Sequence, residues 1–162
     1  MNSKILFQEK QKFTQWWLWL LLIGLFCIPL YGIVKQIILK EPWGDNPMSN
    51  IGLVIFAFSF ILILVLFRMM ELRTIVDKKT ITVQYSPFFT KHFDIRDIQK
   101  ASIATYGFVG YGIKISLKYG TIYNVKGNKG LVLLMNSGKK FLIGTQKPQE
   151  IQRVIDTLLK TL

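Results

Sequence analysis

The chain has 162 residues, of which 51% are hydrophobic, and a formal net charge of +12. So high an apolar fraction in so short a chain indicates a protein whose apolar surface is partly covered by lipid. The single cysteine excludes a disulfide framework, and one cysteine with one histidine provides no metal-ligating cluster of those residue types.

Two long runs without charged residues occupy the first half of the chain, at 16–34 and 51–67. A helix rises about 1.5 Å per residue, so a run of roughly 20 apolar residues crosses the core of a bilayer. A buried core helix and a cleaved signal peptide are the alternatives. Neither run has a polar stripe, however, and no cleavage pattern of small residues follows the first. We therefore expect a transmembrane hairpin over 16–70, with spans at about 16–38 and 50–69.

The flanking charges predict the orientation of this hairpin. Three lysines precede the first run and four basic residues follow the second, whereas the connecting stretch KEPWGDNPMSN carries one lysine and two acidic residues. Loops rich in Lys and Arg remain in the cytoplasm, so both termini are expected there. The protein is thus expected to be a multi-pass protein of the cell (inner) membrane, with residues 1–15 as a cytoplasmic N-terminal segment.

Polar groups are scarce inside the two runs, where Cys27 and Ser59 are the only polar-capable side chains. Ion and substrate pathways usually carry ionisable residues within the membrane. The helices are therefore expected to anchor the protein, and to oligomerise if they pair further, rather than to conduct a substrate.

From Glu71 onward, alternation of apolar and polar residues predicts β-strands separated by turns. The segment TITVQY (80–85) shows this pattern after a tight DKK turn, and GIKISLK (112–118) shows it most regularly. In the latter, three apolar residues share one face and three polar residues the other: Ile113, Ile115 and Leu117 against Lys114, Ser116 and Lys118.

The stretch YNVKGNKGLVLLMNSGKKFLIGTQKP (123–148) places four glycines among five lysines, which raises the question of a phosphate-binding loop. A P-loop requires G-x-x-x-x-G-K-[ST] between a strand and a helix. Here Gly138-Lys139 is followed by Lys140, and Leu133 stands five residues before Gly138. We therefore interpret the stretch as strands joined by glycine turns with a rim of solvated lysines.

The chain ends in an expected helix at about 148–161, because Pro148 suits a first helical position and Glu150 complements the positive N-terminal end. One narrow apolar stripe runs along it: Ile151, Val154, Ile155, Leu158, Leu159 and Leu162. Such a stripe covers a sheet or plugs the open end of a barrel. Alternatively, it docks a partner.

Four motifs extend this pattern: FDIRDI (93–98), GYGIK (110–114), YNVKGNKG (123–130) and GKKFLIGTQKP (138–148). Together with the order of the parts, they resemble a family of unknown function, the small bacterial membrane proteins with a two-helix hairpin before a C-terminal pleckstrin-homology-like (PH-like) domain. The resemblance spans the chain. It implies an α+β membrane protein in which residues 71–162 form a seven-stranded, bent antiparallel sheet or barrel capped by the C-terminal helix. PH-like domains bind headgroups, peptides or protein surfaces, so the fold does not identify the ligand.

Charge gives the more general indication, because residues 71–162 hold 15 Lys and Arg against 6 Asp and Glu, a net of +9. A basic domain tethered to the inner leaflet is attracted by anionic lipid. The candidate contacts with an anionic surface are Lys78, Lys79, Lys114, Lys118, Lys126, Lys129, Lys139 and Lys140. Nucleic acid is not an expected partner, because the lysines are spread over turns without interleaved aromatic stacking platforms.

Catalysis is not expected. His92 is the only histidine and has Asp94 and Asp97 nearby, but no nucleophile context, metal cluster or nucleotide loop accompanies it, so a surface histidine is expected and no cofactor or metal. The expected function is a membrane-anchored interaction or scaffold module that binds a protein, a peptide or the anionic membrane surface. A structural accessory subunit of a larger membrane complex is the alternative, with a lipid-headgroup enzyme as a third. The expected partners are the bilayer, anionic headgroups, and a protein partner or a second copy of the chain.

Overall fold

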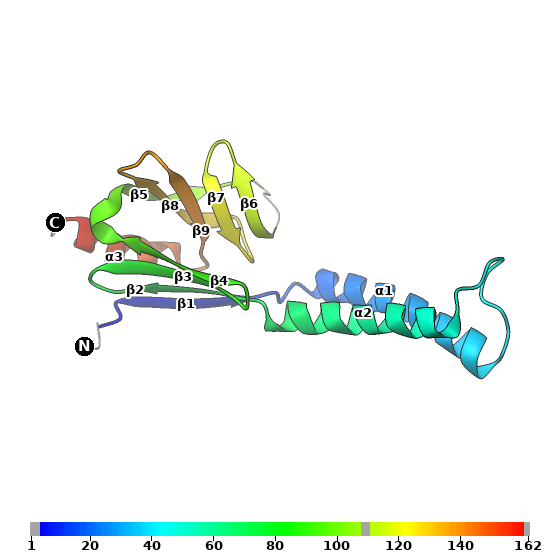
Figure 1. The fold of residues 1–162 in the computed structure, drawn as a ribbon. Helices are drawn as coiled ribbons and strands as arrows, with labels where there is room; N and C mark the ends of the chain where they lie inside the picture. The colour runs from blue at the N-terminus through cyan, green and yellow to red at the C-terminus, as the bar shows by residue number, and fades with distance from the viewer. Residues whose placement is uncertain (1–3, 108–110, 161–162) are drawn as a thin grey trace. The chain divides into compact units, whose positions relative to one another are not determined.

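The computed structural model describes residues 4–107 and 111–160. The chain divides into a helical unit, Thr14–Met69, and a β-rich unit formed by Met1–Phe13 together with Met70–Leu162 (Figure 1). The β-rich unit therefore takes its residues from both sides of the helical unit in sequence.

The helical unit is a hairpin of α1 (Trp16–Ile33), which continues into the π-helical turn η1 (Val34–Ile38), and α2 (Asn50–Met69). The helices Trp16–Ile38 and Asn50–Met69 are long and apolar enough to cross a membrane, and they lie where the sequence predicts two apolar helices. The two helices pack against each other, with Leu53 and Ala57 of α2 buried. Most other side chains of both helices are apolar and exposed, so neither helix has the polar face of an ordinary surface helix.

The connection between the helices is held by contacts within this unit. Gln36 donates from Nε2 to the carbonyl oxygen of Met48 at 2.6 Å and to Oδ1 of Asn50 at 2.8 Å. Trp43 lies against Gly32, where an added Cβ would stand 2.5 Å from the indole ring. The loop is thus folded back onto the end of the first helix.

The β-rich unit contains two sheets. The first is antiparallel, with the order β1-β2-β3-β4. Its strands are β1 (Phe7–Lys12), β2 (Glu71–Val76), β3 (Thr80–Ser86) and β4 (Phe89–Asp94). The second has the order β5-β8-β9-β7-β6, with β7 and β9 parallel. Its strands are β5 (Ile98–Thr105), β6 (Gly112–Ser116), β7 (Gly120–Asn124), β8 (Lys129–Met135) and β9 (Lys140–Gly144).

A short 3-10 turn, η2 (Ile95–Asp97), joins the two sheets, and α3 (Pro148–Lys160) follows the last strand. Aromatic contacts link the sheets through the core. The ring centroids of Phe93 and Phe141 are 4.8 Å apart, and those of Phe89 and Tyr123 are 5.6 Å apart. The helix packs on β5 and β8 and also contacts β1. Ile151 and Ile155 of its apolar stripe are buried, as expected for a helix that covers a sheet, while Leu162 lies outside the described residues.

The structure corrects the expected architecture in two respects. The described residues form nine strands in two sheets, one pair of them parallel, rather than seven antiparallel strands, and they do not close into a barrel. Residues 7–12, which the sequence analysis left in a separate segment, form β1 and pair with β2 from Phe7↔Val76 to Lys12↔Glu71.

The glycine-rich stretch has the predicted strands and turns. Gly127 and Gly138 lie in turns with positive φ, whereas Gly130 and Gly144 lie in strands and face each other across β8 and β9. The stretch therefore forms the centre of the second sheet rather than a loop before a helix.

Candidate functional site

The strand β1 fastens the segment that leads into α3. Glu9 on β1 is buried, and its carboxylate accepts a hydrogen bond from Oγ1 of Thr145 at 2.5 Å and another from the backbone N–H of Gln146 at 2.7 Å. Gln11 donates from Nε2 to the carbonyl oxygen of Gly144 at 2.7 Å. A buried carboxylate is stabilised only by such donors, so these bonds fix the position of the segment.

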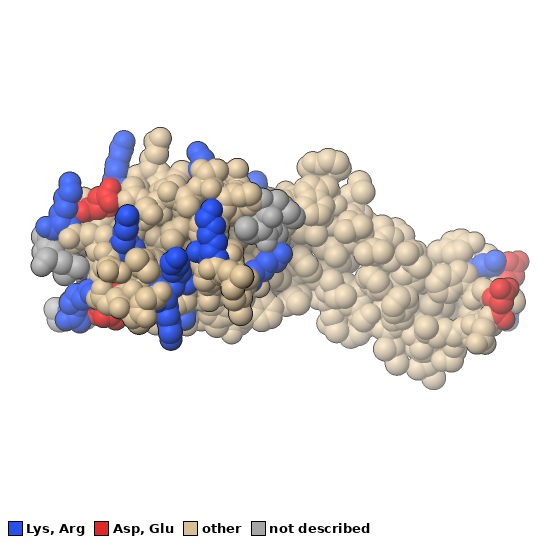
Figure 2. All heavy atoms as spheres, turned by 90° about the horizontal axis from the view of Figure 1, so that it is seen from above, with Lys and Arg blue, Asp and Glu red and all other residues tan. Residues whose placement is uncertain are grey.

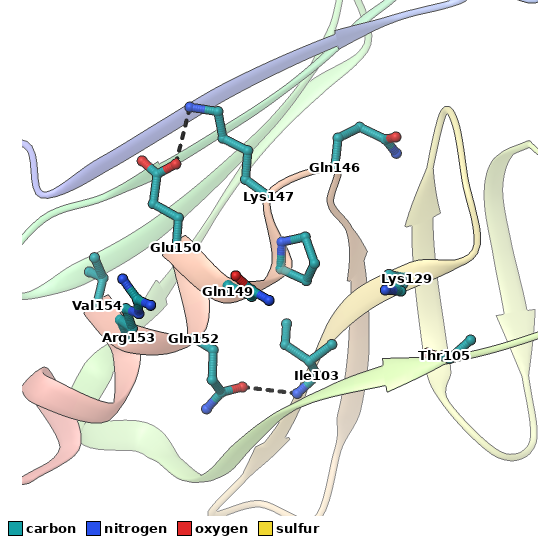
Figure 3. A pocket seen from close by; sticks show the side chains of 11 residues that line it. Ile103, Thr105, Lys129, Gln146, Lys147, Gln149, Glu150, Gln152, Arg153 and Val154 are labelled. Atoms are coloured by element: carbon teal, nitrogen blue, oxygen red, sulfur yellow. Dashed lines mark hydrogen bonds and ion pairs between the residues drawn. The ribbon is translucent and has the colours of Figure 1, made fainter.

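An open groove of about 950 Å³ lies between this segment, the first turns of α3 and the strand β5 (Figure 3). Ile103 and Thr105 contribute from β5, and Lys129 from the start of β8. The helix approaches the edge of β5 closely, because Oε1 of Gln152 accepts a hydrogen bond from the backbone N–H of Ile103 at 2.9 Å. Gln152 thus satisfies one donor on an edge that would otherwise be free to pair with another strand.

The groove is predominantly basic. Lys129, Lys147 and Arg153 line it, and Glu150 is the acidic side chain among the lining residues. Lys147 and Glu150 form an ion pair at 3.2 Å, but both side chains are about half exposed, so this pair contributes little to stability. The start of α3 adds the partial positive charge of a helix N-terminus. The groove therefore suits negatively charged groups, and sequence analysis had nominated only Lys129 of its basic residues.

The eight predicted lysines fall in four places of the β-rich unit. Lys118, Lys139 and Lys140 lie at one end of the second sheet, because the parallel pairing of β7 with β9 brings their two preceding turns to the same end (Figure 1). Lys114 lies on the adjacent edge strand β6. Lys126 and Lys129 lie at the opposite end of the sheet, near the groove. Lys78 and Lys79 lie in the turn between β2 and β3 of the first sheet.

An acidic side chain lies beside the turn that carries Lys78 and Lys79. A small hollow of about 200 Å³ is lined by both lysines together with Asp94 and Arg96. Nη2 of Arg96 contacts Oδ2 of Asp94 at 3.0 Å. This hydrogen bond is the main reason why the pKa of Asp94 is lowered to about 2. The carboxylate beside the two lysines stays ionised near neutral pH, which makes this turn a poor site for a second anion.

His92 is exposed, as expected, and its Nδ1 lies 2.9 Å from Oγ1 of Thr82 on the neighbouring strand. Asp94 is engaged by Arg96, and the backbone carbonyl of Asp97 accepts a hydrogen bond from the N–H of Asn136. The side chains of His92 and Asp94 thus contact different neighbours, Thr82 and Arg96. Across residues 4–107 and 111–160, no group of three His, Cys, Asp or Glu residues could hold a metal ion.

No protein family model matches the chain, and no curated protein sequence matches it either.

Proposed function

We propose that this protein is a membrane-anchored interaction module. In this proposal, α1 with η1 and α2 cross the cell membrane, and the β-rich unit, a variant of the PH-like fold, remains on the cytoplasmic side and binds an acidic partner. The partner is the anionic membrane surface or an acidic segment of a protein or peptide. The module acts by binding rather than by catalysis.

The pairing of β1 with β2 is the observation that carries this proposal. One strand precedes the helices and the other follows them, yet the two are hydrogen-bonded neighbours over six residue pairs. Two helices that each cross the bilayer return the chain to the side on which it started, which is the arrangement that this pairing requires. The linkers between strands and helices are only residues 13–15 and residue 70, so the β-rich unit is tethered closely to its membrane.

The exposed apolar surface of the helices supports their place in lipid. Many apolar side chains of α1 and α2 are about half exposed or more, among them Leu20, Ile28, Ile55 and Leu62. Soluble proteins rarely leave apolar patches of this extent uncovered. Helices whose backbone groups are bonded internally, and whose surfaces are apolar all round, are suited to the hydrocarbon core.

The charge of the β-rich unit supports an acidic partner. Lysines lie in the turns at both ends of the second sheet, and three basic residues line the groove beside α3. The two sheets followed by a C-terminal helix support the PH-like assignment, and the described residues depart from the expected seven antiparallel strands by two additional strands and by the parallel pairing of β7 with β9. Basic surfaces close to the inner leaflet gain from the negative potential of that leaflet.

The test compares substitutions in the helices with substitutions in the β-rich unit, both made in the full-length chain. One variant replaces the outward-facing apolar residues of α1 and α2 by other apolar residues. A second carries Lys129→Glu, Lys147→Glu and Arg153→Glu. Both are compared with the unchanged protein for complexes captured by crosslinking in native membranes. An interaction module keeps its complexes in the first variant and loses them in the second. The reverse result would contradict the proposal and support a structural accessory subunit held by its helices.

A further inference from the structure

Among residues 4–107 and 111–160, the edge strand β6 carries an apolar face that is largely exposed. Ile113, Ile115 and Leu117 are 44%, 89% and 106% exposed, although their alternation is typical of a strand with one buried face. Leu117 stands in the turn that follows the strand and projects fully into solvent. Exposed apolar side chains on an edge strand favour association with another apolar surface.

The reason for this exposure lies in the different widths of the two sheets. Ile113 pairs with Tyr123 of β7, so the two share the face of the second sheet that turns toward the first. Tyr123 is covered by Phe89 of β4, which is the last strand of the first sheet. The strand β6 lies one position beyond β7, past this cover, and its apolar face is therefore open.

Lysines lie next to the exposed apolar residues along the chain and at the same end of the sheet. Lys114 and Lys118 alternate with them along the strand and its turn. Lys139 precedes β9 and Lys140 is its first residue, and both lie close to the start of β7, because β9 runs parallel to β7 and a Cβ at Gly120 would stand 2.0 Å from the carbonyl oxygen of Lys140. Figure 2 views the domain toward this end of the second sheet, with Lys and Arg side chains spread over it and few Asp or Glu.

We propose that the β6–β7 tip, defined as residues 113–118 with Lys139 and Lys140, is a second membrane contact that inserts Ile115 and Leu117 into an anionic bilayer surface. This proposal rests on the membrane anchoring proposed above. Apolar side chains enter the boundary between headgroups and acyl chains, while lysine ammonium groups remain among the headgroups with their stems along the apolar layer. Because the helices already hold the domain at the membrane, the second contact forms at a high effective concentration.

Charge complementarity favours the bilayer over a second copy of the chain as the occupant. Two copies that met through β6 would bring their Lys114 and Lys118 side chains together, whereas an anionic leaflet attracts them. The basic residues flank the apolar side chains on the same short segment, as in other segments that lie at a membrane surface. The β6–β7 tip therefore fits lipid, and a protein occupant is an outcome that the experiment can distinguish.

The experiment uses the full-length protein with Cys27→Ser and Leu117→Cys, labelled at residue 117 with an environment-sensitive fluorophore. The protein is placed in nanodiscs of phosphatidylcholine alone or with phosphatidylglycerol, and each lipid mixture also carries an acyl-chain quencher. We expect a blue shift and quenching that require phosphatidylglycerol and are lost at about 1 M salt, where the Debye length is about 3 Å. Lys139→Glu with Lys140→Glu should lower the ratio of quenched to unquenched protein more than about tenfold, because each basic residue near an anionic surface changes that ratio roughly fivefold.

A matched control is Lys78→Glu with Lys79→Glu, which reverses two adjacent lysines in a turn of the other sheet. This control should leave the quenching at residue 117 unchanged. The proposal would be overturned if quenching at residue 117 were lost in the Lys78→Glu, Lys79→Glu variant but kept in the Lys139→Glu, Lys140→Glu variant. It would also be overturned by a blue shift at residue 117 without quenching, because that result indicates a protein occupant. A label at Leu21→Cys in α1 reports on anchoring separately. Quenching at residue 21 without quenching at residue 117 refutes only the membrane contact of the β6–β7 tip. Absence of quenching at both residues refutes the proposed anchoring of the helices in the membrane.

Discussion

At the scale of single residues, the least expected group in the core is the carboxylate of Glu9. It faces inward from β1 and accepts hydrogen bonds from Thr145 and Gln146. Glu9→Ala leaves a buried hydroxyl and a backbone N–H without their acceptor, so the free energy of unfolding of the β-rich unit should fall by about 2–4 kcal/mol. Hydrogen exchange of the amides at 145–147 in the full-length protein measures this loss. Gln8→Ala, at the exposed neighbour on the same strand, should leave that exchange unchanged.

Tyr85 is a second buried polar group. Its side chain is 1% exposed, its hydroxyl has no hydrogen-bond partner among the described residues, and burial raises its pKa from 10.0 to about 12. The folded state therefore holds the phenolic proton more tightly than the unfolded state. The resulting stability is fully present below pH 10 and is lost as pH rises from 10 to about 12.

Tyr85→Phe should remove this alkaline loss and should raise stability at neutral pH by about 1 kcal/mol, because an unpaired hydroxyl no longer has to be buried. Thermal unfolding between pH 8 and 12 measures both effects. Tyr119→Phe, at a half-buried tyrosine in the same unit, controls for the loss of a hydroxyl in general. Destabilisation by Tyr85→Phe at neutral pH would show that the hydroxyl has a partner after all.

Gly138, in the turn before β9, and Gly120, the first residue of β7, give a matched pair. Gly120 and Gly138 both have positive φ, 68° and 78°, but an added Cβ at Gly120 would stand 2.0 Å from the carbonyl oxygen of Lys140, whereas at Gly138 nothing lies within 4 Å. Gly138→Ala should lower the free energy of unfolding by about 1 kcal/mol, because alanine is strained at positive φ. Gly120→Ala should cost more than about 3 kcal/mol, since it also separates β7 from β9. Equal shifts in thermal unfolding temperature would show that the contact with Lys140 relaxes freely.

At the scale of elements, the helices and most strands could be predicted because their apolar periodicity is local. The strand β1 was missed because its inward face includes Glu9 and Gln11 beside Phe7, so an apolar count over residues 7–12 shows no buried face. Buried and exposed positions do alternate along β1, but two of the three buried side chains are polar, so apolar residues alone do not show the alternation. The partners that justify their burial lie far away in the sequence, at residues 144–146.

The candidate lysines were found individually but not as a surface. Lys118 and Lys140 are brought to one end of the sheet by the parallel pairing of β7 with β9, a crossover that depends on contacts between distant strands. The exposure of Ile115 likewise depends on where the first sheet ends, and alternation along β6 alone indicates burial instead. Local patterns predict which residues share a face, whereas packing between sheets decides whether that face is covered.

The strand β1 predicts how the β-rich unit can be separated from the helices. Lys12 and Glu71 are paired at the end of the ladder, so residues 14–69 can be replaced by a hairpin loop of about four Gly and Ser residues. This chain should be soluble and should give dispersed amide resonances. Residues 70–162 alone lack β1, leave the edge of β2 open and should aggregate. If the two chains proved equally stable and monomeric, β1 would not be an integral part of the unit.

At the scale of the whole molecule, the pairing of β1 with β2 sets a requirement on membrane topology. Residues before α1 and after α2 have to lie on the same side, and the loop between the helices has to lie on the other if each helix crosses the bilayer. This requirement is independent of the distribution of flanking charges from which the cytoplasmic orientation was predicted. The two arguments converge on an even number of crossings.

Single cysteines in a Cys27→Ser background test this topology in the full-length protein. Gln8→Cys, Asp45→Cys and Lys78→Cys each replace an exposed residue, in β1, in the helix connection and in the β2–β3 turn. In sealed inside-out vesicles, a membrane-impermeant maleimide should label residues 8 and 78 and spare residue 45, and in intact spheroplasts the pattern should reverse. Labelling of all three positions in both preparations would show that the helices do not cross the membrane. Opposite labelling of residues 8 and 78 would be incompatible with the β1–β2 ladder, because hydrogen-bonded neighbours cannot lie on opposite sides of a bilayer.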